Sequence, residues 1–155
     1  HALQHSSRMA RWVRGAVGGD ASAFSRETVE EWAAQIRGAG LRGLLLYTHF
    51  WEGKGAHLVG LAMASVESLE EADRAIDAGW RVFADIPFKK AGSRHVRTRK
   101  FPELKPGVTH FVTPKGRKLP VCPASRPELR RDCNSCGLCD GSQHKEVAGI
   151  ACPQH

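Results

Sequence analysis

Five cysteines lie in the C-terminal part of the chain: Cys122, Cys133, Cys136, Cys139 and Cys152. The middle three form a C-x2-C-x2-C run, and the outer two are each followed by proline. Thiolates at this spacing can turn toward one metal group, and Gly137 inside the run lets the backbone fold between them. The pattern therefore predicts a metal site built from soft sulfur ligands.

Two kinds of metal group suit these ligands. A 4Fe-4S cluster takes one thiolate per iron, and a C-x2-C-x2-C run with a distant Cys-Pro is a familiar pattern for it. Zinc would take the same four thiolates in a tetrahedron, but zinc fingers more often show two separate C-x2-C pairs. We expect an iron-sulfur cluster, with Cys122 as the fourth ligand because it follows a predicted hairpin. Cys152, close to the end of the chain, is the alternative fourth ligand.

Length and composition predict an ordinary globular protein. The chain has 155 residues, of which 41% are hydrophobic and 25% charged, enough for one domain with its own core. No apolar stretch is long enough to span a membrane and no signal peptide is evident, so we expect a cytoplasmic location. In a reducing compartment the cysteines are more typical of ligands than of disulfides. Because the chain opens at His1, an N-terminal part is expected to be missing.

The net charge of +7 favours an anionic partner such as nucleic acid. One basic run comprises Lys89, Lys90, Arg94, Arg97, Arg99 and Lys100. Further basic residues follow at Lys115, Arg117, Lys118, Arg126, Arg130 and Arg131. The run is bounded by prolines and has almost no aromatic residues, so we expect contacts to phosphates rather than to bases. The alternative is a solvated surface without a partner.

The hydrophobic pattern predicts an α/β fold with a small parallel sheet, either open or an arc of a partial β/α barrel. Strands are predicted at 11–17, 43–48, 58–64 and 80–85, the last ended by Pro87. Helices are predicted at 25–38 and from Ser68 to Gly79, where Ser68 and Glu71 match a capping box. A basic loop at 88–107 and a C-terminal metal-binding module at 108–155, which opens with a hairpin, complete the predicted organisation.

The predicted strand ends suggest a second candidate site. Asp20, His49 and Asp85 each lie at or just after the end of a predicted strand. Because ligands of α/β sheets bind outside the carboxyl ends of the strands, these side chains could converge as acid, base or ligand. Each also has a structural explanation, as a turn cap, a loop histidine or an ion-pair partner. No nucleophile elbow, zinc-protease motif or phosphate-binding loop is present.

Several motifs resemble, in the same order, a family of uncharacterised phage and prophage proteins. They are Arg14-Gly15-Ala16-Val17-Gly18-Gly19-Asp20, Leu46-Tyr47-Thr48-His49, the stretch from Ser65 to Ala72, Val121-Cys122-Pro123-Ala124, and Cys133-x2-Cys136-Gly137-Leu138-Cys139. Members resemble partial β/α barrels of the radical-SAM type and usually carry a further cysteine-rich segment upstream. This sequence lacks that segment and the C-x3-C-x2-C signature, so the resemblance does not extend to radical chemistry.

These observations together predict a metal-binding protein of a phage or mobile element that acts on or near nucleic acid in the host cell. One alternative is a non-enzymatic module in which a zinc knuckle supports nucleic-acid binding. Another is a structural or interaction protein whose metal only stabilises the fold. The sequence favours no particular reaction.

Overall fold

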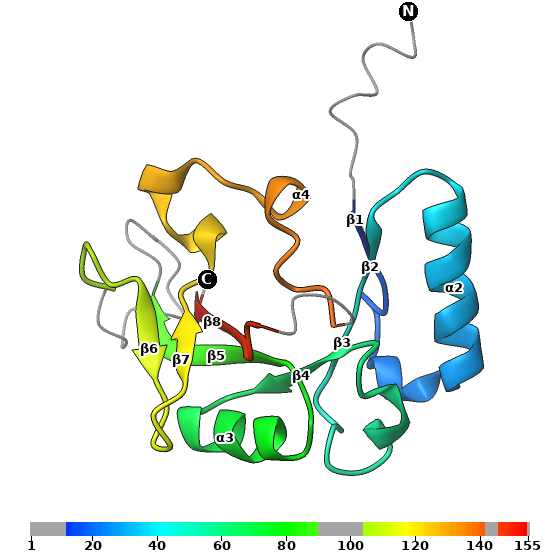
Figure 1. The fold of residues 1–155 in the computed structure, drawn as a ribbon, viewed down its shortest axis with the longest axis horizontal. Helices are drawn as coiled ribbons and strands as arrows, with labels where there is room; N and C mark the ends of the chain where they lie inside the picture. The colour runs from blue at the N-terminus through cyan, green and yellow to red at the C-terminus, as the bar shows by residue number, and fades with distance from the viewer. Residues whose placement is uncertain (1–11, 90–103, 142–145, 155) are drawn as a thin grey trace, which may run out of the picture.

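The computed structural model describes residues 12–89, 104–141 and 146–154. It contains a pair of parallel strands, β1 (Trp12–Arg14) and β2 (Gly43–Leu45), and a four-stranded parallel sheet. The four strands are β3 (Tyr47–Thr48), β4 (Met63–Val66), β5 (Val82–Lys89) and β8 (Gly149–Gln154), in that order across the sheet. An antiparallel hairpin, β6 (His110–Val112) and β7 (Lys118–Pro120), lies beside them (Figure 1).

The fold is α/β with a small, open parallel sheet, as predicted. Leu46 separates β2 from β3, but its carbonyl oxygen accepts a hydrogen bond from Met63 N–H at 2.9 Å, so the pairing continues past this break. The neighbouring strands therefore follow chain order from β1 to β5, and β8 is added beside β5. The described strands do not close into a barrel. Strand β8 returns to the sheet from the C-terminal module and brings Cys152 into it.

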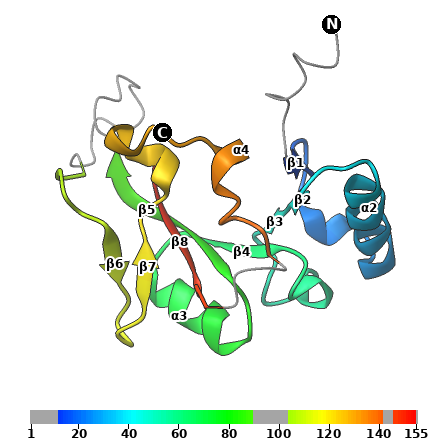
Figure 2. The same ribbon diagram turned by 45° about the horizontal axis from the view of Figure 1, so that its top comes forward.

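Helix α2 (Arg26–Gly38) packs against the β1–β2 pair, and helix α3 (Leu69–Asp77) covers one face of the four-stranded sheet (Figures 1 and 2). Local chemistry fixes their first turns, because Ser25 Oγ accepts from Thr28 N–H and Ser68 Oγ accepts from Glu71 N–H. The Glu71 carboxylate also accepts from Glu67 N–H at 2.8 Å. The predicted capping residue Ser68 is thus confirmed.

Two predicted strand boundaries are wrong. Residues 58–64 were expected to form one strand, but Leu58 ends a short 3-10 helix, η3 (Ala56–Leu58), and β4 begins only at Met63. Pro87 was expected to end the fourth strand, yet β5 runs through it to Lys89. The pairing of β5 with β8 is irregular between Ile86 and Lys89, and proline is tolerated at such a bulge because no ladder N–H is required there.

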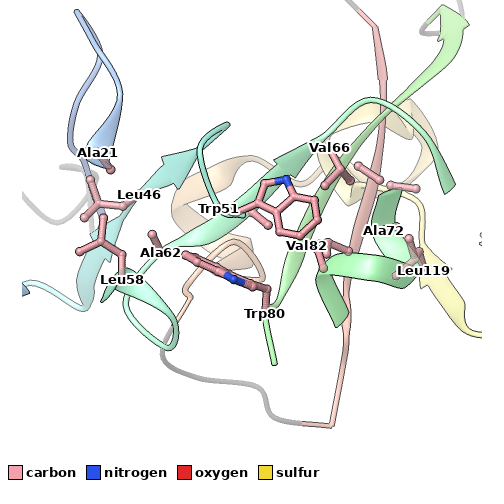
Figure 3. Close-up of a cluster of buried hydrophobic side chains, with 14 of the residues drawn as sticks. Ala21, Leu46, Trp51, Leu58, Ala62, Val66, Ala72, Trp80, Val82 and Leu119 are labelled. Atoms are coloured by element: carbon pink, nitrogen blue, oxygen red, sulfur yellow. The ribbon is translucent and has the colours of Figure 1, made fainter. Parts of the chain in front are cut away.

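One hydrophobic core joins the N-terminal α/β region to the C-terminal hairpin and β8. Trp51 and Trp80 lie in the middle of this cluster, and Leu119 of β7 and Ala151 of β8 belong to it (Figure 3). Strand β8 approaches β5 very closely, since a Cβ on Gly149 would stand 2.2 Å from the carbonyl oxygen of Val82. No described helix has the length and apolar character of a membrane span.

Candidate metal centre

The C-x2-C-x2-C run folds into one helical turn followed by a reversal. Helix α4 (Cys133–Cys136) supplies the turn, and Gly137 reverses the chain with a φ of +69°. Side chains other than glycine are strained at this φ, and a Cβ on Gly137 would also stand 2.5 Å from Cζ2 of Trp12. The run and the buried ring of Trp12 therefore fit each other closely, and the loop after α4 carries Cys139 back toward the turn.

Arg81, just before β5, holds the end of the run and the segment that follows it. Its guanidinium donates hydrogen bonds to the carbonyl oxygens of Leu138 at 2.9 Å, Val147 at 3.0 Å and Asp140. Burial lowers the pKa of Arg81, and the nearby Asp140 and Cys139 oppose that shift. This arginine was not identified from the sequence, where the only signal is a cation between Trp80 and Val82, at the start of a buried strand.

Cys122 reaches the same place from the hairpin. It follows β7, and its N–H donates to the carbonyl oxygen of Ala151 at 2.8 Å, which ties the end of the hairpin to β8. A cavity of about 20 Å³ lies between this point and the run. Its lining comprises Leu45, Cys122, Ala124, Cys133, Cys136, Gly137, Leu138, Cys139 and Ile150. The structure thus brings together the four cysteines that the sequence predicts as ligands, within an apolar surround.

Tyr47 in β3 lies against this group of thiols. Its hydroxyl is hydrogen-bonded to the sulfur of Cys139, and the guanidinium of Arg14 lies 5.3 Å from its ring centre. Burial raises the pKa of Cys139 to about 12, with the neighbouring thiols adding to the shift and the Tyr47 hydrogen bond opposing it. Burial also raises the pKa of Tyr47. The tyrosine hydroxyl is therefore the donor that can stabilise a thiolate at Cys139.

Cys152 is buried and does not line the cavity. It lies next to Cys122, and the two thiols are hydrogen-bonded. The hydrogen bond from Cys152 lowers the pKa of Cys122, against the effect of burial. The same contact and burial raise the pKa of Cys152. The hairpin end and β8 therefore bring two thiols into contact.

The spacing of the thiols bears on what they could hold. Among the described residues, no three histidine, cysteine, aspartate or glutamate side chains are arranged to hold a metal ion. The space between the four cysteines admits a water-sized object. Trp12 Nε1, packed against Gly137, is buried and has no hydrogen-bond partner in the part of the chain that the structure describes. The site thus combines separated thiols with an unsatisfied buried donor beside them.

The second predicted site is brought together only in part. Asp20 and His49 are adjacent, with His49 Nδ1 at 3.5 Å from Asp20 Oδ2. Asp85 lies on β5, beside Cys152 of β8 in the register, and β4 separates β5 from β3. Asp20 accepts hydrogen bonds from Ser22 N–H, Thr48 Oγ1 and His49 N–H at 2.7 to 2.8 Å. Burial raises the pKa of Asp20, but these hydrogen bonds outweigh it and lower the value to about 2. Asp20 is therefore a fixed anion that caps the turn rather than a proton carrier near neutral pH.

Most of the predicted basic run lies outside the described residues. This holds for Lys90, Arg94, Arg97, Arg99 and Lys100, and Lys89 is described only as the end of β5. Three of the later cations are engaged within the chain. Arg117 binds Asp73 and Asp77, Lys115 binds Asp77, and Arg126 binds Glu128. The pairs of Arg117 and Lys115 fix the hairpin to α3, and all of these ion pairs reduce the charge free to meet an anionic partner.

The functional argument rests on the structure, because comparisons with known proteins gave no significant match. No family model matches the chain, and no curated protein or solved structure matches it significantly.

Proposed function

We propose that this chain is a metalloprotein in which Cys122, Cys133, Cys136 and Cys139 hold an iron-sulfur cluster of the 4Fe-4S kind. The observation that carries the proposal is that these four thiols, from a hairpin end and a helical turn, line one apolar cavity. Thiolates that enclose a common apolar space are the ligand set that such a cluster takes. When bound, it would supply one-electron transfer or a rigid cross-link between the hairpin and the run.

The pattern of the cysteines supports a cluster over a single zinc ion. A C-x2-C-x2-C run with a distant Cys-Pro is familiar from 4Fe-4S proteins, whereas zinc fingers more often show two separate C-x2-C pairs. The cavity of about 20 Å³ holds about one water molecule, so binding of a cluster would require the thiols to move apart.

The surrounding residues complement a sulfur-rich anion. Tyr47 donates toward Cys139, Arg14 lies over the Tyr47 ring, and the half-buried Arg81 fixes the loop that carries Cys139. Hydrogen bonds and positive charge near cluster sulfurs are the means by which proteins adjust a cluster's potential. Trp12 Nε1 is a further hydrogen-bond donor beside the run, and it has no partner among the described residues.

Anaerobic purification followed by iron, sulfide and zinc analysis and an absorbance spectrum tests the proposal. We expect iron and sulfide with visible charge-transfer absorbance, lost in Cys122→Ser and retained in Cys152→Ser. Stoichiometric zinc that also depends on Cys122 would overturn the cluster but keep the four-cysteine centre. Metal content that depends on Cys152 and not on Cys122 would overturn the assignment of ligands.

We also propose that the protein acts on or near nucleic acid in a phage or mobile-element setting. The net charge of +7 supports an anionic partner, and the motif resemblance supports the setting. The sequential order of the parallel strands supports reading the sheet as an arc of a partial β/α barrel. Retention on DNA or RNA at low salt, with affinity falling log-linearly as salt rises, is the expected result. Absence of any salt-dependent retention would remove this part of the proposal.

A further inference from the structure

Cys152 is a buried thiol that the proposed centre does not use, and its position beside Cys122 is built into the backbone. Val121 and Ala151 form a parallel bridge, so the residues that follow them, Cys122 and Cys152, are neighbours. The Cys122 N–H to Ala151 oxygen bond of 2.8 Å holds this register. Neighbouring strands lie about 4.8 Å apart, within the Cα separation of about 4.4 to 6.8 Å that a disulfide needs.

The two thiols lie in different environments, so Cys122 could leave the four-cysteine centre and bond to Cys152 instead. Cys122 lines the four-cysteine cavity, whereas Cys152 does not line it and has Ser125 Oγ at 3.9 Å from its sulfur. Cys152 is only 4% exposed, which prevents it from pairing with a second protein molecule. Cys122 is therefore the thiol within its reach, and Cys122 can be shared between the centre and Cys152.

We propose that Cys122 and Cys152 close into a reversible disulfide when the protein meets a peroxide, and that this withdraws Cys122 from the four-cysteine centre and empties it. The second half rests on the proposed function, whereas disulfide formation does not. The device would make occupancy of the centre depend on the oxidation state of the cell.

The chemistry balances with the peroxide as oxidant. The Cys122 thiolate attacks one peroxide oxygen, the O–O bond breaks, and the departing hydroxide takes up a proton to leave as water. The sulfur of Cys152 then attacks the resulting sulfenic acid, the S–S bond forms as the S–O bond breaks, and the Cys152 proton leaves with the oxygen as a second water. Two thiols are oxidised and one peroxide is reduced, and an added dithiol reverses the change by exchange.

The tryptic map of the chain separates the possible partners. Trypsin cleaves after lysine and arginine but not at the Arg126–Pro127 bond. This places Cys122 in peptide 119–130, the three-cysteine run in peptide 132–145 and Cys152 in peptide 146–155. The anaerobically purified, metal-loaded protein is treated with hydrogen peroxide, alkylated and digested without reductant. Mass spectrometry should find 119–130 joined to 146–155, and a dithiol added before alkylation should abolish that species. Iron and zinc retained by the protein are measured on the same samples.

The matched variant is Cys152→Ser, with Cys152→Ala as a second variant if the first folds poorly. Both should keep the metal under anaerobic conditions and lose it several-fold more slowly than the wild type under peroxide. Peptide 119–130 joined mainly to 132–145, or no cross-link at all, would overturn the disulfide. A cross-link that forms while the metal stays bound would overturn the withdrawal of Cys122. Protein purified without metal but forming the cross-link would sink the metal centre and leave the disulfide standing.

Discussion

Replacement of Asp20 by asparagine tests whether this residue holds the turn or serves chemistry. The carboxylate accepts three hydrogen bonds, from Ser22 N–H, Thr48 Oγ1 and His49 N–H. Its pKa of about 2 in the folded protein lies nearly two units below the ordinary 3.8. One unit corresponds to about 1.4 kcal/mol, so the shift sets an upper limit of about 2.5 kcal/mol, which solvent screening reduces to a contribution of about 2 kcal/mol to the free energy of unfolding. Asn keeps the shape but turns one acceptor into a donor that faces an N–H.

The pH dependence of this contribution has a definite sign. Because the pKa of Asp20 is lower in the folded than in the unfolded chain, the stabilisation is complete above the unfolded value of 3.8 and is lost as the pH falls toward 2. Asp20→Asn should therefore unfold about 2 kcal/mol more easily near neutral pH, with the difference shrinking below about pH 4. Urea denaturation followed by tryptophan fluorescence at a series of pH values measures it.

His49→Ala is the matched control, because the His49 side chain is 65% exposed and its backbone N–H remains to bind Asp20. An exposed pair of this kind contributes less than about 1 kcal/mol, so this variant should unfold close to the wild type. Equal urea midpoints for Asp20→Asn and wild type at neutral pH, or a difference that does not change with pH, would refute the reasoning.

Three further predictions concern the centre and the basic run. Gly137→Ala should lower metal content and cost more than about 1 kcal/mol, because of its φ of +69° and the contact with Trp12, whereas Gly18→Ala, with open space around it, should not. Arg81→Lys should speed loss of metal to a chelator, since an ammonium cannot reach three carbonyl oxygens together; an unchanged rate would contradict this. Replacement of Lys89, Lys90, Arg94 and Arg97 by alanine should flatten the salt dependence of nucleic-acid retention. An unchanged slope would count against the basic run as a binding surface.

The sequence alone determined those features that depend on a few neighbouring residues. Ser68 begins α3 because its hydroxyl reaches an N–H three residues on, and Gly116 closes the β6–β7 hairpin with a φ of +81°. The alternation of strands and helices likewise predicted a parallel sheet. The C-x2-C-x2-C spacing predicted a compact turn of thiols because the helical turn of α4 and the reversal at Gly137 are local.

Only the tertiary structure decided which distant residues meet. Cys122 and Cys152 are both followed by proline, and the position of the hairpin and the register of β8 alone put the first in the cavity and the second behind it. The order of the strands separates Asp85 from Asp20, although all three predicted residues follow the same sequence rule. Arg81 gained its role from the approach of a loop almost sixty residues away in the sequence. Such meetings depend on sheet order, register and packing, which no short stretch of sequence encodes.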